Sequence, residues 1–313
     1  MRRILVTGSN GQIGVELVPH LRSIYGTDNI FATDIYKAPG EVSEGGHFDF
    51  LDVRDGNAVA AFLDGKKINT IIHMAGILSA RGEGDPQLAW DVNMNGLYTV
   101  LEAARPRNCA LQFPSSIAAF GPSTPPRNTP QDTIMRPTTM YGISKAAGEM
   151  LCDYYHKKYG LDTRGLRFPG LISYEALPGG GTTDYAVHIY YDAVKSGKYA
   201  SYIGKGSFMD MMYMPDALDA IIKLMEADPS KLVHRSAFNI SAMSFDPEGI
   251  AASIKKVIPT FELSYDVDPV RQAIADSWPD SLDCSAAREE WGFDPKYDID
   301  AMTRDMLERV KGK

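Results

Sequence analysis

The stretch ILVTGSNGQIG, residues 4–14, decides the fold. Its first four residues form a continuous apolar and β-branched run, which is typical of a strand buried on both faces of a parallel sheet. Gly8, Gly11 and Gly14 follow at once, and an amphipathic segment then continues to about Tyr25. Glycines at a strand–helix junction allow a tight turn and a close approach of backbone N–H groups to phosphate oxygens. We therefore expect a dinucleotide-binding loop here, although its spacing is G-x-x-G-x-x-G rather than the commoner G-x-G-x-x-G.

The same alternation of short apolar runs and longer amphipathic segments continues as far as Phe168. It predicts a parallel sheet with helices on both faces and right-handed connections, which is the doubly wound α/β (Rossmann) fold. The expected strands are residues 4–7, 29–34, 47–50, 70–75, 110–116 and 163–168, and the expected helices are residues 11–25, 58–63, 86–104 and 141–159.

Beyond Phe168 the alternation breaks down, and the chain becomes richer in Gly, Pro and Asp. Helices are expected at residues 216–225 and 247–257, and a strand at residues 237–240. We expect a nucleotide-binding Rossmann domain over residues 1–170 and a smaller, interleaved substrate-binding lobe over residues 171–313. Part of the later chain, about residues 210–240, should return to the first domain.

Composition excludes several classes of protein. The 313-residue chain carries a formal charge of −8 and has no cluster of Lys and Arg, which argues against a nucleic-acid partner. Cys109, Cys152 and Cys284 lie far apart, as expected of reduced thiols in a cytoplasmic protein. The histidines lack metal-ligand spacing, so no metal is expected. No apolar run approaches the roughly 18–20 residues of a membrane span, and the run after the N-terminal MRR is too short for a signal peptide.

Asp34 stands at the end of the second expected strand, 20 residues after Gly14. A carboxylate at this position can accept hydrogen bonds from both ribose hydroxyls of an adenosine, and it repels a 2′-phosphate. The sequence therefore predicts NAD rather than NADP as the cofactor.

Tyr141 and Lys145 open a long helix, and residues four apart share a helix face. A neighbouring ammonium favours the phenolate, so we expect Lys145 to lower the pKa of Tyr141 and make it a general acid or base. This spacing alone is common on amphipathic surfaces. Ser116 makes it specific, because it ends the preceding strand, where ligands of open α/β sheets bind.

Taken in order, these motifs resemble those of the extended short-chain dehydrogenase/reductase superfamily, the NAD-dependent epimerase/dehydratase-like proteins, over essentially the whole chain. The resemblance implies that Ser116 polarises the substrate, that Tyr141 moves the proton and that Lys145 binds the nicotinamide ribose. It also assigns cofactor contacts to Gly8, Asn10, Gly11, Gln12, Ile13, Gly14, Asp34, Asp52, Val53, His73, Ala75, Gly76, Asn93, Tyr141, Lys145 and Phe168.

Within this superfamily the remaining pattern is similar to the short-chain type of L-threonine 3-dehydrogenase. The segments that carry this similarity are residues 76–80, 113–118, 178–186, 211–216 and 277–279. Members that act on nucleotide sugars usually have an Arg in the stretch that here reads SFMDMMYMPD, residues 207–216, and its absence argues for a small substrate without a diphosphate. The similarity implies substrate contacts from Ser79, Ser116, Tyr141, Gly181, Thr182 and Trp278.

The implied reaction is the oxidation of the β-hydroxyl of L-threonine to 2-amino-3-oxobutyrate, a step of threonine catabolism toward glycine. A nucleotide-sugar epimerase or reductase is the alternative enzyme, and a redox-sensing protein that keeps the cofactor fold without catalysis is the alternative outside enzymes. The resemblance also implies a homodimer that pairs the helices at 86–104 and 141–159 in a four-helix bundle. Residues that could face either the partner or the sheet are Leu88, Leu97, Leu101, Leu151 and Tyr155.

Overall fold

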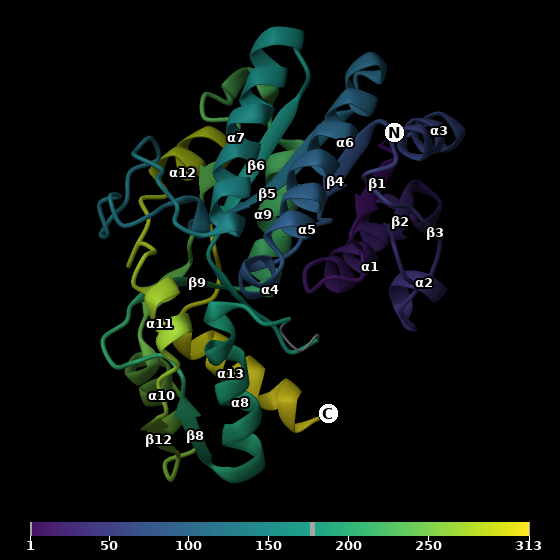
Figure 1. The fold of residues 1–313 in the computed structure, drawn as a ribbon. Helices are drawn as coiled ribbons and strands as arrows, with labels where there is room; N and C mark the ends of the chain where they lie inside the picture. The colour runs from purple at the N-terminus through teal and green to yellow at the C-terminus, as the bar shows by residue number, and fades with distance from the viewer. Residues whose placement is uncertain (1, 176–178, 313) are drawn as a thin grey trace.

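A seven-stranded parallel sheet forms the centre of the molecule, as the computed structural model of residues 2–175 and 179–312 shows (Figure 1). The strand order is β10-β6-β5-β4-β1-β2-β3. The order reverses between β1 and β4, and this is the position where open α/β sheets bind ligands. The strands are β1 (Ile4–Thr7), β2 (Ile30–Asp34), β3 (Phe48–Phe50), β4 (Thr70–His73), β5 (Ala110–Ser116), β6 (Thr163–Phe168) and β10 (Phe238–Asn239).

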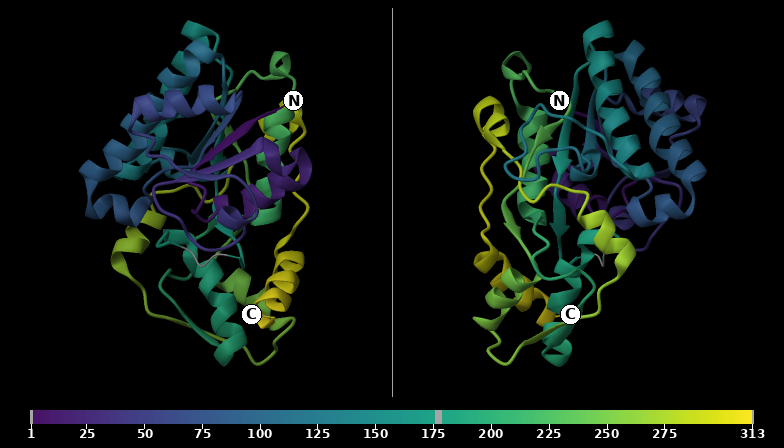
Figure 2. Two further views of the ribbon diagram at one scale, coloured as in Figure 1. Left: turned by 90° about the vertical axis from the view of Figure 1, so that its right-hand side faces the viewer. Right: turned by 60° about the vertical axis from the view of Figure 1, so that its left-hand side comes forward.

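Helices cover both faces of this sheet, as predicted, and Figure 2 shows the three layers from two further sides. Apolar side chains of the strands pack against the apolar stripe of each helix, so each face has a core of its own. One face carries α1 (Gly14–Tyr25), α9 (Met214–Glu226) and α12 (Ser285–Trp291). The opposite face carries α3 (Gly56–Lys66), α6 (Gly96–Ala104) and α7 (Met140–Tyr159).

The helix expected over residues 86–104 has an interruption. It consists of α5 (Pro86–Trp90), a π-helical turn (Asp91–Asn95) and then α6. Asn93 in that turn is buried, and its amide accepts from Ile77 N (2.7 Å) and donates to Ile77 O (3.1 Å) and Ser144 Oγ (3.1 Å). The irregular turn thereby ties the loop after β4 to α7, and π turns of this kind occur frequently at functional sites.

The C-terminal lobe has its own core around α8 and two small sheets. One sheet has the order β11-β9-β7 and the other pairs β12 with β8. Strand β10 and helix α9, although late in the chain, belong to the main sheet and its covering layer. The elements of the lobe are β7 (Gly170–Ile172), α8 (Tyr185–Ser196), β8 (Lys198–Ser201), β9 (Met209–Tyr213), β11 (Met243–Phe245), α10 (Pro247–Lys255), β12 (Glu262–Tyr265), α11 (Pro269–Ala275) and α13 (Ile299–Lys311).

Two short helices complete the fold, α2 (Glu41–Glu44) and α4 (Ser79–Gly84). The first long helix begins at Gly14 rather than at Gly11, because the residues between them form the loop over the end of β1. The strands expected at 70–75 and 237–240 are shorter than predicted, and they are β4 and β10. Among the described residues, none of the helices has the length and apolar character needed to cross a membrane.

Candidate active site

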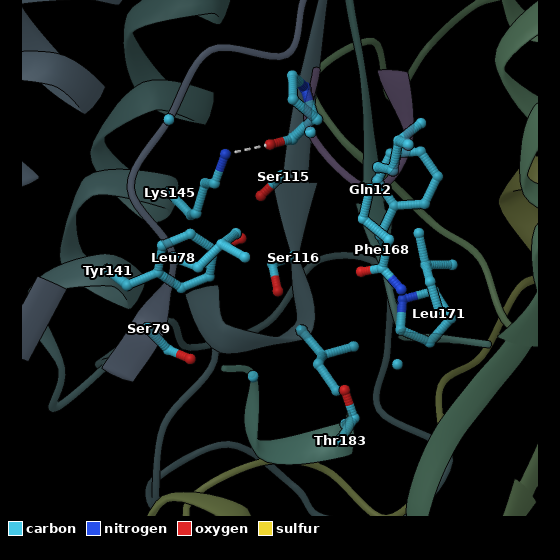
Figure 3. A pocket seen from close by; sticks show the side chains of 18 of the residues that line it. Gln12, Leu78, Ser79, Ser115, Ser116, Tyr141, Lys145, Phe168, Leu171 and Thr183 are labelled. Carbon is cyan, nitrogen blue, oxygen red and sulfur yellow. Dashed lines mark hydrogen bonds between the residues drawn. The ribbon is translucent and has the colours of Figure 1, made fainter. Parts of the chain in front are cut away.

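A single cleft at the carboxyl ends of β1, β4, β5 and β6, closed below by the C-terminal lobe, brings most of the predicted site residues together (Figure 3). Tyr141 and Lys145 extend into it from α7, Ser116 lies at its centre, and Gln12 and Phe168 stand on the far side. Predicted residues that line it are Gly8, Gly11, Gln12, Ile13, Gly14, Gly76, Ser79, Ser116, Tyr141, Lys145, Phe168, Gly181, Thr182 and Trp278.

The glycine loop has the shape of a phosphate cradle. Gly8 has φ +63°, and a Cβ there would lie 2.5 Å from Ala75 N. A Cβ on Gly14 would lie 2.4 Å from Ser9 O. Side chains at these two positions would push the loop away from the strand ends. The amide nitrogen of Gln12 is buried and has no hydrogen-bond partner among the described residues, as expected of a group that awaits a ligand. These residues fit a dinucleotide.

Asp34 lies beside the glycine loop, where an adenosine ribose would be expected. Its Oδ2 accepts from Asn10 N (3.0 Å) and its Oδ1 from Ile35 N (2.8 Å), so backbone groups fix the carboxylate in place. Asp52 forms an ion pair with Arg54 at 2.6 Å. Asn10, Asp34 and Asp52 do not line the cleft itself, and neither do Val53, His73, Ala75 and Asn93.

The side chains of Val53 and His73 are among those buried outside the cleft. Val53 packs in the core beneath α3 and α6. The His73 ring bonds Thr7 Oγ1 at 3.0 Å, and burial lowers its pKa to about 3, which keeps it neutral. Any contact of Val53 or His73 with a cofactor would therefore come from backbone atoms.

Local sequence places Tyr141 next to Ser116. Thr139 caps α7 by accepting from Gly142 N (3.1 Å). A Cβ on Gly142 would lie 2.2 Å from Ala118 O, so only glycine allows α7 to approach the turn that follows Ser116 so closely. Lys145 Nζ donates to Pro114 O at 2.6 Å and lies 5.4 Å from the centre of the Tyr141 ring. The three predicted catalytic residues therefore face one space.

The expected lowering of the pKa of Tyr141 by Lys145 is wrong for the cofactor-free chain. Burial raises the pKa of Tyr141 to about 12, and only its interaction with Ser116 acts in the opposite direction. Burial also lowers the pKa of Lys145 to about 8, against the attraction of Glu149. For each of these two groups, removal from water outweighs the neighbouring interaction that favours its charged form.

The opposite wall of the cleft comes from the C-terminal lobe. Thr182 begins a short 3₁₀ turn, Thr182–Asp184, and Asp184 accepts from Gly180 N (2.9 Å) and Gly181 N (2.5 Å), which holds the glycine run. Trp278 reaches the cleft from the segment after α11. Pro178, part of the motif singled out in the sequence, lies outside the described residues.

Asp184, Thr183, Leu171 and Ser115 also line the cleft and were not predicted. Asp184 ends the Gly-Gly-Gly-Thr-Thr-Asp run, and an acid three residues after Gly181 is a capping signal that could have identified it. Lys145 is the only Lys or Arg among the described residues that line the cleft. Asp210, in the stretch 207–216 that lacks an Arg, is buried and accepts from Ser241 Oγ (2.6 Å).

The fold and the cleft define a dinucleotide-binding α/β protein with a Ser-Tyr-Lys site. The model of the NAD dependent epimerase/dehydratase family matches residues 4–241. An "uncharacterized epimerase/dehydratase" of Staphylococcus haemolyticus is 58% identical over 100% of this chain and 99% of its own length. The chain belongs to this epimerase/dehydratase family, a branch of the extended short-chain dehydrogenases/reductases.

Solved structures narrow the similarity further. The L-threonine dehydrogenase from Clostridium difficile is 57% identical, with a TM-score of 0.99 over 100% of this chain and 98% of that one. The L-threonine dehydrogenase from Phytophthora infestans is 48% identical, with a TM-score of 0.95 over 99% of both chains. This chain is thus an enzyme of the family whose structural neighbours are L-threonine dehydrogenases.

Proposed function

We propose that this enzyme oxidises the β-hydroxyl of L-threonine with NAD, giving 2-amino-3-oxobutyrate on the route toward glycine. The observation that carries the proposal is that Ser79, Thr182 and Trp278 line the same cleft as Ser116 and Tyr141. Similarity to threonine dehydrogenases at 42–57% identity supports it. The lack of a second Lys or Arg among the described lining residues favours a substrate without a diphosphate.

In this reaction each of these residues of the cleft has a separate role. Ser116 donates to the oxygen that reacts, and ionised Tyr141 removes the proton of the β-hydroxyl as a general base. Lys145 holds the nicotinamide ribose, and Phe168 packs beside the ring. NAD, when bound, supplies the hydride acceptor and a positive charge that favours the tyrosinate. Ser79 and Thr182 orient the amino acid, and Trp278 excludes water on the side of the C-terminal lobe.

A substrate assay tests the proposed reaction directly. Purified enzyme with NAD should form NADH with L-threonine, and much less with L-serine, UDP-galactose or simple alcohols. Epimerisation of UDP-galactose without oxidation of threonine would overturn the proposal in favour of a nucleotide-sugar enzyme.

Asp34→Ala tests the choice of cofactor. We expect a loss of about tenfold or more in kcat/KM with NAD, because two hydrogen bonds from the ribose to a charged acceptor disappear. Activity with NADP should stay equal or rise, because the repulsion of the 2′-phosphate is removed. Initial rates with both cofactors measure the ratio, and Asp28→Ala, an exposed acid of the turn before β2, is the control. An unchanged ratio of the two rates would refute the role of Asp34.

We propose a homodimer through α5, α6 and α7, but not by three of the residues first considered. Leu97, Leu101 and Tyr155 are buried against the sheet. Exposed apolar side chains instead lie at Trp90 of α5, at Tyr98 of α6 and at Met150 and Tyr154 of α7. Isolated exposed apolar residues are ordinary, but a group of them on neighbouring helices is typical of an interface.

Tyr98→Glu combined with Met150→Glu should therefore convert the dimer to a monomer, because two charges per subunit would be buried without partners. Light scattering coupled to size exclusion measures the mass. Val233→Glu changes a still more exposed apolar residue outside these helices and should leave the mass unchanged. A monomeric wild-type protein would refute the proposed interface.

A further inference from the structure

A buried ion pair lies directly behind the catalytic residues. Glu149 stands one helical turn after Lys145 on α7, and only 1% of its surface is exposed. Its carboxylate accepts from the hydroxyl of Ser115 and from the guanidinium of Arg167, the latter at 2.8 Å. Tyr141, Lys145 and Glu149 thus follow at intervals of four residues along one face of α7.

The partners of Glu149 are the immediate neighbours of cleft residues. Ser115 pairs in register with Arg167 across β5 and β6, and Ser116 pairs with Phe168. Because successive side chains of a strand point to opposite faces, Ser115 and Arg167 turn toward α7. Ser116 and Phe168 form the next step of the ladder and line the cleft, which Ser115 also reaches.

The guanidinium of Arg167 also contacts groups other than Glu149. It donates to Gln131 O (2.7 Å) and Asn239 Oδ1 (2.9 Å), and its guanidinium lies 5.0 Å from the centre of the Phe120 ring. A buried ion pair of this kind costs desolvation energy that an apolar pair would avoid. What such a pair does provide is a fixed geometry with several directional bonds.

We propose that Glu149 is a positioning residue of the active site, which fixes the ends of β5 and β6 against α7 and keeps Lys145 charged. The first part follows from its bonds to Ser115 and Arg167, because these hold the strand ends that carry Ser116 and Phe168. The second part follows from a carboxylate placed one turn from a buried ammonium. The inference rests on the proposed role of Lys145 in holding the cofactor.

The loss of the Lys145 proton can be measured separately from the ionisation of the groups around it. Burial lowers the pKa of Lys145 to about 8, and the attraction of Glu149 is the largest effect that opposes this. Other groups that face it titrate far from pH 8: burial places the pKa of Tyr141 at about 12 and that of His73 at about 3, and it raises the pKa of the Cys152 thiol beyond its usual range. Asp153 is a further acid near Glu149 and Arg167, and burial raises its pKa above the ordinary carboxylate value.

The test is the pH dependence of NADH binding, because it needs no substrate. In the wild-type enzyme we expect affinity for NADH to fall above about pH 8, as Lys145 loses its proton. Glu149→Gln keeps an acceptor oxygen for Ser115 and removes the charge, so the fall should begin about one pH unit lower or more. Asp153→Asn makes the same chemical change one turn further along α7 and should leave the profile unmoved.

Ser115→Ala tests whether Glu149 positions the strand ends, separately from its effect on the charge of Lys145. It removes the hydroxyl that Glu149 holds and leaves the carboxylate, so we expect NADH affinity to fall about fivefold to tenfold at pH 7 with an unmoved pH profile. This variant also decides the question if Glu149→Gln does not fold. Glu149→Gln with the wild-type profile, or Ser115→Ala with wild-type affinity, would overturn the proposal. Wild-type enzyme that binds NADH with the expected profile and does not oxidise L-threonine would refute only the proposed substrate.

Discussion

Tyr141→Phe should reduce the rate of oxidation by a factor of about 10²–10⁴, the range that a positioned general base contributes. The phenyl ring fills the same space, so the shape of the cleft and its packing with α7 remain. The affinity for NADH should change little, because Lys145 keeps its bond to Pro114 O and the glycine loop is untouched. Steady-state rates and NADH fluorescence titration measure the two effects separately.

Tyr159→Phe is the matched control for this variant. Tyr159 ends the same helix, 44% of its surface is exposed, and it does not line the cleft. Its replacement should leave the rate unchanged. A Tyr141→Phe enzyme that retains more than about a tenth of the wild-type rate would mean that another group accepts the proton, since general-base catalysis contributes at least about 10²-fold.

Gly14→Ala should abolish cofactor binding and lower the free energy of unfolding. The new Cβ would lie 2.4 Å from Ser9 O and 2.7 Å from Ser9 Cα, which are backbone atoms that cannot rotate away. The loop must therefore move, and with it the N–H groups that meet the pyrophosphate. We expect a loss of more than about 100-fold in NADH affinity, together with a destabilisation of about 1–3 kcal/mol from overpacking. Fluorescence titration and urea unfolding measure these quantities.

Gly65→Ala is the control, and we expect it to raise the free energy of unfolding rather than lower it. Gly65 lies in α3, and outside its chain neighbours and the nearby backbone of that helix no described atom lies within 4 Å of the Cβ that would be added. Alanine there should stabilise the protein by about 0.5–1 kcal/mol, because it favours the helix, and NADH binding should be unchanged. NADH binding by Gly14→Ala at wild-type affinity would show that the loop does not hold the cofactor as proposed.

The strands and the glycine loop could be predicted because the sequence encodes them locally. β1, β2, β4 and β5 are short runs rich in apolar residues, as is typical of central strands of a parallel sheet, and the loop glycines follow one of them directly. Element ends were less accurate, since the π turn at Asp91–Asn95 depends on bonds between Asn93 and residues far along the chain.

The catalytic trio could be named from order and spacing, whereas its electrostatics could not. The pKa of Tyr141 depends on how completely α7 covers it, and no local pattern reports burial depth. For the same reason the sequence did not indicate which face of α6 is buried: Leu97 and Leu101 are buried, whereas Tyr98 is exposed. Glu149 was within reach of sequence reasoning, because it continues the spacing of four residues that had identified Lys145.

Because β10 and α9 return to the main sheet, neither the N-terminal nor the C-terminal half of the chain should fold on its own. The core over α1 includes Val18 and Ile30 from the beginning of the chain together with Ile221, Phe238 and Ala287 from near its end. A fragment that stops after β6 would expose that face to water and leave β6 as an open edge. We therefore expect one cooperative unfolding transition for both lobes, and a truncated nucleotide-binding fragment to aggregate rather than bind a cofactor.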